Sequence, residues 1–168
     1  MIDITKYASK NKLKPILNYV YLHIDKNGNP AAVATDTFRL AQVGVNIAGL
    51  DEVIKLGFYT PEAWKKITKL YNKDDVTLYK EIQIIVEKEM LHQPEEDYPN
   101  YENIIPKYED MERFKGSFLI NGDYLCDLIK MFQHKKLKTF DFDKVQENED
   151  LIAYFDEDTT VLIMKMKN

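Results

Sequence analysis

The sequence predicts an α+β fold in which helices cover one face of antiparallel sheets. Short runs of β-branched and aromatic residues are separated by turn-forming residues, which is typical of antiparallel strands. Two amphipathic segments with helical spacing interrupt these runs. The order strand, helix, strand, strand occurs over 58–88 and again over 118–167, so we expect an internal structural repeat built from such units.

The first part of the chain predicts strands at 19–24, 31–36 and 39–45, with a turn at 25–30 that is rich in Asp, Asn, Gly and Pro. Residues 46–55 are expected to form a loop or short connector. A helix is expected over 61–71, because Thr60 suits the N-cap and Pro61 suits the first helical position. Two strands at 76–79 and 82–89, joined by a tight connection at Lys80 and Glu81, are expected to follow.

The segment 90–115 contains three prolines and has little periodicity, which favours an extended surface connector. The earlier pattern then returns. We expect a strand at 117–120, a helix over 122–134 capped by Asn121, and strands at 137–143, 151–157 and 159–167.

Composition sets limits on the function of the chain. It has 168 residues, 45% of them hydrophobic and 30% charged, as in an ordinary globular domain. Its apolar runs are too short to span a bilayer, and its single cysteine excludes an internal disulfide, so a cytoplasmic location is expected. The net charge of −5 gives no overall attraction to nucleic acid, so contact with DNA requires a local basic face.

The predicted helix at 61–71 supplies one basic face. Lysines follow each other there at spacings of three and four on the side opposite the apolar residues: Lys65, Lys66, Lys69 and Lys73. The face is either a solvated helix surface or a surface that binds phosphates.

Motifs for catalysis are absent from the sequence. There is no nucleotide-binding glycine loop, no metalloprotease helix and no nucleophile elbow. The three histidines, His23, His92 and His134, lack the spacing of metal ligands. We therefore expect no enzyme, no metal and no cofactor; the rival interpretation is a hydrolase that uses Asp36 and His23 as an acid/base pair.

Two segments resemble a known family. The octapeptide ATDTFRLA at 34–41 is similar to the ATDGHRLA signature in the second domain of the bacterial DNA polymerase III beta subunit, the replicative sliding clamp. The segment YPNYENIIP at 98–106 resembles the FPDYRRVIP segment that closes the same domain, and the C-terminal TTVLIMKMKN resembles the tail of the third domain. Thr37 and Phe38 stand where the family usually has Gly and His.

The resemblance implies a DNA-clamp-like fold and an abridged clamp. Residues 1–106 would correspond to the second domain, 107–116 to a connector and 117–168 to the last half of the third domain. Four copies would supply enough half-domains for a ring, which leaves oligomerisation open. The chain is then either a ring-forming processivity factor on duplex DNA or a ring-incompetent accessory or decoy protein.

The resemblance also implies a groove that binds linear motifs of DNA polymerases and repair proteins. Carried over residue by residue, this groove consists of Thr35, Thr37, Phe38, Arg39, Leu40, Pro99, Asn103, Ile104, Ile163, Met164 and Met166. Methionines and an aromatic ring form an adaptable apolar surface for a Leu or Phe anchor, and Arg39 would donate hydrogen bonds at the rim.

Overall fold

The computed structural model describes residues 1–46, 53–73, 75–91, 97–107, 111–113, 119–133, 145–147, 151–156 and 159–166. In these ranges the strands are β1 (Val20–Ile24), β2 (Pro30–Thr35), β3 (Arg39–Gly44), β4 (Gly57–Tyr59), β5 (Met90–Leu91), β6 (Glu112–Arg113), β7 (Val145–Glu147), β8 (Leu151–Asp156) and β9 (Thr159–Met164). The helices are α1 (Pro61–Tyr71), α2 (Tyr79–Glu89) and α3 (Gly122–Gln133), with short 3-10 turns η1 (Thr5–Tyr7), η2 (Pro15–Asn18), η3 (Val76–Leu78) and η4 (Tyr101–Asn103).

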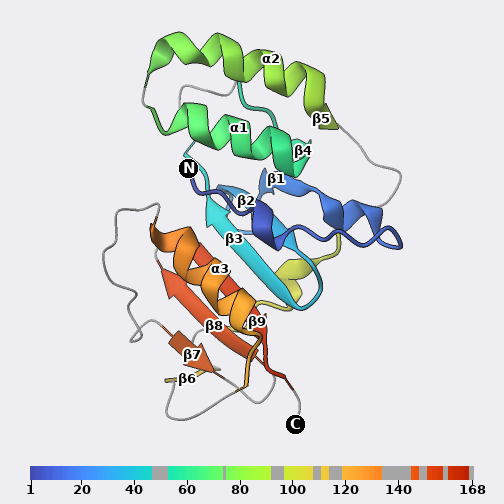
Figure 1. Ribbon diagram of the computed structural model, residues 1–168, viewed down its shortest axis with the longest axis vertical. Helices are drawn as coiled ribbons and strands as arrows, with labels where there is room; N and C mark the ends of the chain where they lie inside the picture. The colour runs from blue at the N-terminus through green and yellow to red at the C-terminus, as the bar shows by residue number, and fades with distance from the viewer. Residues whose placement is uncertain are drawn as a thin grey trace.

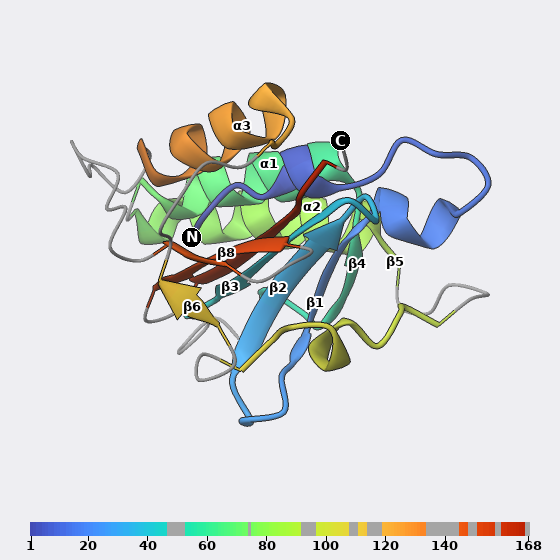
Figure 2. The same ribbon diagram turned by 90° about the horizontal axis from the view of Figure 1, so that it is seen from below.

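The strands form one antiparallel sheet in the order β5-β4-β1-β2-β3-β9-β8-β7-β6 (Figure 1). All three helices and the N-terminal segment lie on one face of the sheet, and the segment that carries η4 lies on the other (Figure 2). The predicted α+β class, with helices on one face of antiparallel strands, is therefore confirmed.

The middle of the sheet joins the two ends of the chain. Strand β9 pairs with β3 in antiparallel register, with Leu40 opposite Leu162 and Arg39 opposite Ile163. The sheet therefore runs without a break from the N-terminal strands to the C-terminal strands. The predicted division at 106 and 117 remains a prediction about the origin of the two parts.

Helices α1 and α3 begin where the sequence predicts them. Thr60 Oγ1 accepts a hydrogen bond from the Ala63 amide at 3.1 Å, as an N-cap residue should. Asn121 Oδ1 accepts one from the Asp123 amide at 2.9 Å and caps α3 in a similar way.

The prediction of two strands at 76–79 and 82–89 is wrong, because these residues form η3 and α2. The β-branched content of the segment suggested strands. Its burial follows a helical period instead: Ile82 and Val86, one turn apart, are buried, whereas Ile84 is 49% exposed. A strand would have placed Ile82 and Ile84 on the same face. The strand, helix, strand, strand repeat therefore fails in its first unit, where α2 packs beside α1.

Two further expectations differ from the structure. The segment 90–115 is not only a surface connector: Tyr101 and Met111 are buried on the sheet, and Glu112–Arg113 form strand β6. Of the strand expected at 117–120, the described residues Leu119 and Ile120 lie outside regular structure. The strand expected at 137–143 lies outside the described residues.

Apolar side chains pack against both faces of the sheet. The main core lies between the sheet and the helices and contains residues such as Trp64, Leu22, Val43 and Ile163. A smaller cluster on the other face includes Leu40, Leu162 and Tyr101. In the part of the chain described here, no helix is long and apolar enough to cross a bilayer.

Candidate peptide-binding site

The connection between β2 and β3 is a tight loop that is braced by its own side chains. Asp36 Oδ1 accepts hydrogen bonds from the amides of Phe38 (3.0 Å) and Arg39 (3.1 Å). Thr35 Oγ1 donates to the Arg39 carbonyl oxygen at 2.7 Å and accepts from the Thr37 amide at 3.1 Å. Short polar side chains that bond to nearby backbone are well suited to such a turn.

Thr37 has a φ of 81°, in the left-handed region that favours glycine. This position is where the resembling family usually carries Gly. The loop therefore has a β-branched residue at a position whose backbone conformation suits glycine, so the backbone is strained there.

Strand β9 completes the site beside this loop. The Met164 amide donates to the Phe38 carbonyl oxygen at 2.9 Å, which fixes the end of β9 against the loop. Leu162 and Met164 alternate with Ile163 along the strand, so they face the side of the sheet that carries η4.

The loop, β9 and the segment after η4 together form a pocket of about 220 Å³. Its lining is mainly apolar and consists of Thr35, Thr37, Phe38, Arg39, Leu40, Ile104, Leu162 and Met164. Leu40 is 2% exposed, whereas Phe38 is 58% and Met164 47% exposed. The buried leucine thus forms the floor, and the exposed phenylalanine and methionine form walls that an incoming apolar side chain could cover.

Seven of the residues named from the sequence line this pocket: Thr35, Thr37, Phe38, Arg39, Leu40, Ile104 and Met164. Pro99, Asn103 and Met166 are exposed but do not line it. Ile163 is 1% exposed and belongs to the core under the helices, because it points to the opposite face from its neighbours. Leu162 was missed, although the two-residue period that places Met164 in the pocket also places Leu162 there.

Arg39 does not have the role expected at the rim, because its guanidinium is held by partners within the protein. Nε donates to Asp36 at 2.9 Å, Nη1 to Asp127 of α3 at 2.8 Å, and Nη2 to the Lys6 carbonyl oxygen at 2.6 Å. Its side chain is only 10% exposed. Burial acts to lower the pKa of Arg39, but the hydrogen bonds to Asp127 and Asp36 outweigh it and raise that pKa.

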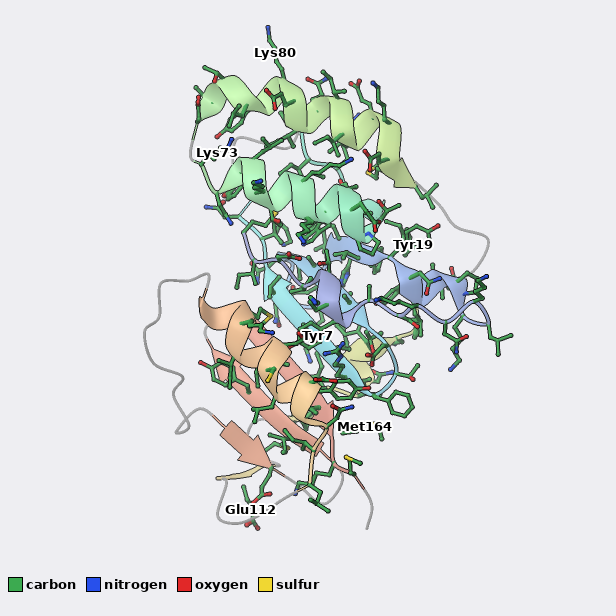
Figure 3. The ribbon with its side chains drawn as sticks, in the orientation of Figure 1. Tyr7, Tyr19, Lys73, Lys80, Glu112 and Met164 are labelled. Carbon is green, nitrogen blue, oxygen red and sulfur yellow. The ribbon has the colours of Figure 1, made fainter. Side chains whose placement is uncertain are left out.

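Two aromatic rings enclose the same guanidinium. Its Cζ atom lies 5.0 Å from the centre of the Tyr7 ring and 4.3 Å from that of Tyr124, within the range of cation–π contacts. Burial raises the pKa of Tyr7 far above its ordinary value, so its hydroxyl stays protonated. Arg39 therefore fastens the pocket loop to the N-terminal segment and to α3. Figure 3 labels Tyr7 of this N-terminal segment and Met164 of the pocket.

A second hollow, of about 570 Å³, lies on the helix side between the N-terminal segment, α1 and α3. We call it the basic groove, because Lys6, Lys65, Lys69 and Lys130 line it. The four lysines come from three elements: Lys6 from the N-terminal segment, Lys65 and Lys69 from α1, and Lys130 from α3. Asp3 and Asp127 also line the groove.

The four lysines predicted to face DNA are all exposed, but they do not form one face. Lys65 and Lys69 line the basic groove. Lys66 forms an ion pair with Glu89 of α2 at 2.9 Å and does not line the groove. Lys73 follows the C-terminal end of α1 and does not line the groove.

The acid/base pair of the rival interpretation is not assembled. His23 on β1 has its Nε2 atom 2.5 Å from Tyr101 Oη and its Nδ1 atom 2.9 Å from the Ile24 carbonyl oxygen. Asp36 lies beyond the far end of β2 and is bound to Arg39. Burial lowers the pKa of His23, so it is the neutral ring that packs against Tyr101. Among the described residues, no group of His, Cys, Asp and Glu is arranged to hold a metal ion.

Comparison with known proteins finds similarity at the level of structure. No protein-family profile and no curated protein matches the sequence. The fold is similar to that of DNA polymerase III subunit beta from Borrelia burgdorferi in complex with a natural product, at 15% identity and a TM-score of 0.57 over 98% of this chain.

It is also similar to the DNA polymerase sliding clamp of Pseudomonas aeruginosa (12% identity over 98% of this chain, TM-score 0.59). A third similar structure is the sliding clamp of Bartonella birtlesii bound to griselimycin (12% identity over 99% of this chain, TM-score 0.54). The match covers only 60% to 62% of these longer chains. The chain therefore has the sliding-clamp fold and spans about three fifths of the length of these similar chains.

Proposed function

We propose that this protein is a non-enzymatic, sliding-clamp-like component of DNA replication or repair that captures short linear motifs of partner proteins. The observation that carries the proposal is the apolar pocket, which combines Leu40, Ile104 and Met164 from three distant segments within a clamp fold. Packing alone does not require an exposed phenylalanine and methionine beside a buried leucine floor. A partner that buries Phe38 and Met164 gains the apolar contact area that water now covers.

The partner has a definite chemistry. A pocket of about 220 Å³ has room for one large apolar side chain, and its wall is formed by Phe38 and Met164. A peptide with adjacent Leu and Phe anchors, as in polymerases and repair factors that bind clamps, fits this description. Since the Arg39 guanidinium is already engaged, affinity depends on apolar burial more than on a charged rim contact.

The test is calorimetric titration of a short Leu-Phe peptide against the wild type and the Met164→Ala variant. Met164 is exposed at the pocket wall, so we expect its truncation to cost about 1–2 kcal/mol of binding while the melting temperature hardly changes. Lys73→Ala, far from the pocket, is the matched control and should bind as the wild type does. No binding to the wild type at millimolar peptide would reject the proposal.

Contact with duplex DNA without sequence preference is the second part of the proposal. It is supported by the lysines of the basic groove, which concentrate positive charge on a chain whose net charge is −5. Two forms of the protein fit this function: a ring of several copies around DNA, or a ring-incompetent accessory or decoy protein. Mass measurement in solution, with and without DNA, separates them, because a monomer under both conditions excludes the ring.

A further inference from the structure

The pocket and the basic groove share one connecting residue. Arg39 lines the pocket. Three of its partners, Lys6, Tyr7 and Asp127, line the basic groove on the helix side of the sheet. Asp127 itself takes no part in the pocket lining.

We propose that Arg39 is a positioning residue that couples the peptide pocket to the basic groove. This inference rests on the proposed function, because it concerns the affinity of the same pocket for a peptide. The coupling runs from Asp127 through the guanidinium to the loop of Thr37 and Phe38, and from there to Met164.

Each step of this connection is a short contact. Asp127 Oδ2 accepts from Arg39 Nη1 at 2.8 Å, and Asp36 binds both Arg39 Nε and the Phe38 amide. The Phe38 carbonyl oxygen then accepts from the Met164 amide at 2.9 Å. The loop residue between them, Thr37, is held in a left-handed conformation, so the loop keeps its shape only while these contacts hold it.

The side chains involved are largely shielded from water, which makes the ion pairs directional and strong. Arg39, Asp36 and Asp127 are 10%, 18% and 15% exposed in their side chains. A partly buried guanidinium that donates to two carboxylates fixes the relative position of the elements that carry them. Loss of the α3 carboxylate removes the ion pair between the guanidinium and α3, and leaves Asp36, the Lys6 carbonyl oxygen and the rings of Tyr7 and Tyr124 as its partners.

The experiment compares Asp127→Asn with Asp123→Asn. Both residues lie on α3 one turn apart, and both substitutions remove one negative charge, but Asp123 is exposed and has no contact with Arg39. Titration of the Leu-Phe peptide should give a dissociation constant raised about threefold to thirtyfold for Asp127→Asn and unchanged for Asp123→Asn.

Two controls separate coupling from simple loss of stability. Partial unfolding lowers the calorimetric stoichiometry and leaves the affinity of the folded fraction unchanged, whereas coupling changes the affinity at full stoichiometry. The conservative variant Asp127→Glu is the second control. It keeps the negative charge, so its affinity for the peptide should lie closer to that of the wild type than the affinity of Asp127→Asn does.

A readout without peptide comes from the ¹³C-methyl NMR signals of the methionines. In Asp127→Asn, we expect the Met131 signal to move because Met131 lines the groove with Asp127, and the Met164 signal to move by transmission. The signal of Met90, a core residue in β5, should not move. A Met131 shift with Met164 unmoved and unchanged peptide affinity would overturn the inference. If the wild type binds no peptide, the proposed function fails, and the Met164 signal alone decides whether the coupling exists.

Discussion

At the scale of single residues, Thr37 shows how the loop keeps a shape that its own side chain opposes. A non-glycine residue in the left-handed region costs about 1–2 kcal/mol, and a β-branched side chain is among the least suited. The bonds from Thr35 and Asp36 to the loop amides compensate for this strain. Strained backbone of this kind is typical of binding sites, and here it lies at the pocket wall.

We therefore predict that Thr37→Gly stabilises the protein. Glycine relieves the strain but is more flexible in the unfolded chain, so the net gain in the free energy of unfolding should be roughly 0.5–1 kcal/mol. Urea denaturation followed by circular dichroism measures it. Thr160→Gly, the same change within β9, should be destabilising by about 1 kcal/mol, since a strand does not need glycine. A loss of stability in Thr37→Gly would show that the threonine side chain contributes more than its strain costs.

Arg39 is the residue for which sequence and structure give different roles. The resemblance implies a donor at the rim, and the spacing along the chain offers no sign of Asp127, which lies 88 residues away. The pairing depends on α3 packing over the sheet beside β3, which is a tertiary arrangement. A local pattern therefore identified the residue as part of the site but could not identify its partner.

At the scale of elements, α2 is the clearest case in which residue type gave the wrong prediction. Its isoleucines and valine favour strands by residue type. The free energy gained when one face of the helix is buried against α1 is larger than that preference. Strands β1, β2 and β3 were predictable because turn-forming residues separate them and their register keeps apolar residues inside. The spacing of Ile82 and Val86, four residues apart, was the available signal for a helix. The prediction instead followed the β-branched content of the segment.

The helical assignment of α2 has a direct test in two neighbouring isoleucines. Ile82 is 0% exposed and Ile84 is 49% exposed. We expect Ile82→Ala to lower the free energy of unfolding by about 2–4 kcal/mol, because it leaves a cavity in the core, and Ile84→Ala to change it by less than about 0.5 kcal/mol. Thermal or urea unfolding of both variants gives the comparison. Equal losses would favour a strand, in which the two side chains share a face.

At the scale of the whole molecule, charge is distributed unevenly over an acidic chain. The net charge is −5, but four lysines meet in the basic groove on the helix side. The pocket lies toward the other face of the sheet, where Leu40 and Leu162 pack near Tyr101, and is mainly apolar. The two surfaces therefore lie apart, so the proposed contacts with phosphates and with a peptide do not compete for the same residues.

The groove makes a specific prediction for DNA binding. We expect Lys65→Glu with Lys69→Glu to lower the affinity for a short duplex at least about tenfold at low salt and to reduce the slope of log affinity against log salt by about 2. The control pair, Lys66→Glu with Lys80→Glu, makes the same charge change beside or on α2 and should have a smaller effect. Fluorescence anisotropy of a labelled duplex measures both. Equal losses in the two pairs would assign the effect to net charge rather than to the groove.

The pocket could be predicted from sequence only in part, because it is formed by the whole molecule. The loop residues and Met164 follow from local motifs, whereas Ile163 was misplaced because the resemblance does not specify which way each residue of a strand points. The two-residue period that places Met164 in the pocket was the available signal for Leu162, whereas the pairing of β9 with β3 emerges only once the sheet is assembled. The residues of the local turn were therefore predictable, and the strand that pairs beside them was not.

The pairing of β9 with β3 also has a consequence for the time at which the site comes into existence. During synthesis, the ribosome delivers Leu40 long before Leu162 and Met164, by roughly 6–25 s at 5–20 residues per second. Throughout that interval β3 is an open edge, and the loop of Thr37 and Phe38 lacks the backbone bond that Met164 supplies. A nascent chain thus lacks the complete pocket that the proposed function requires, and the pocket forms together with completion of the sheet.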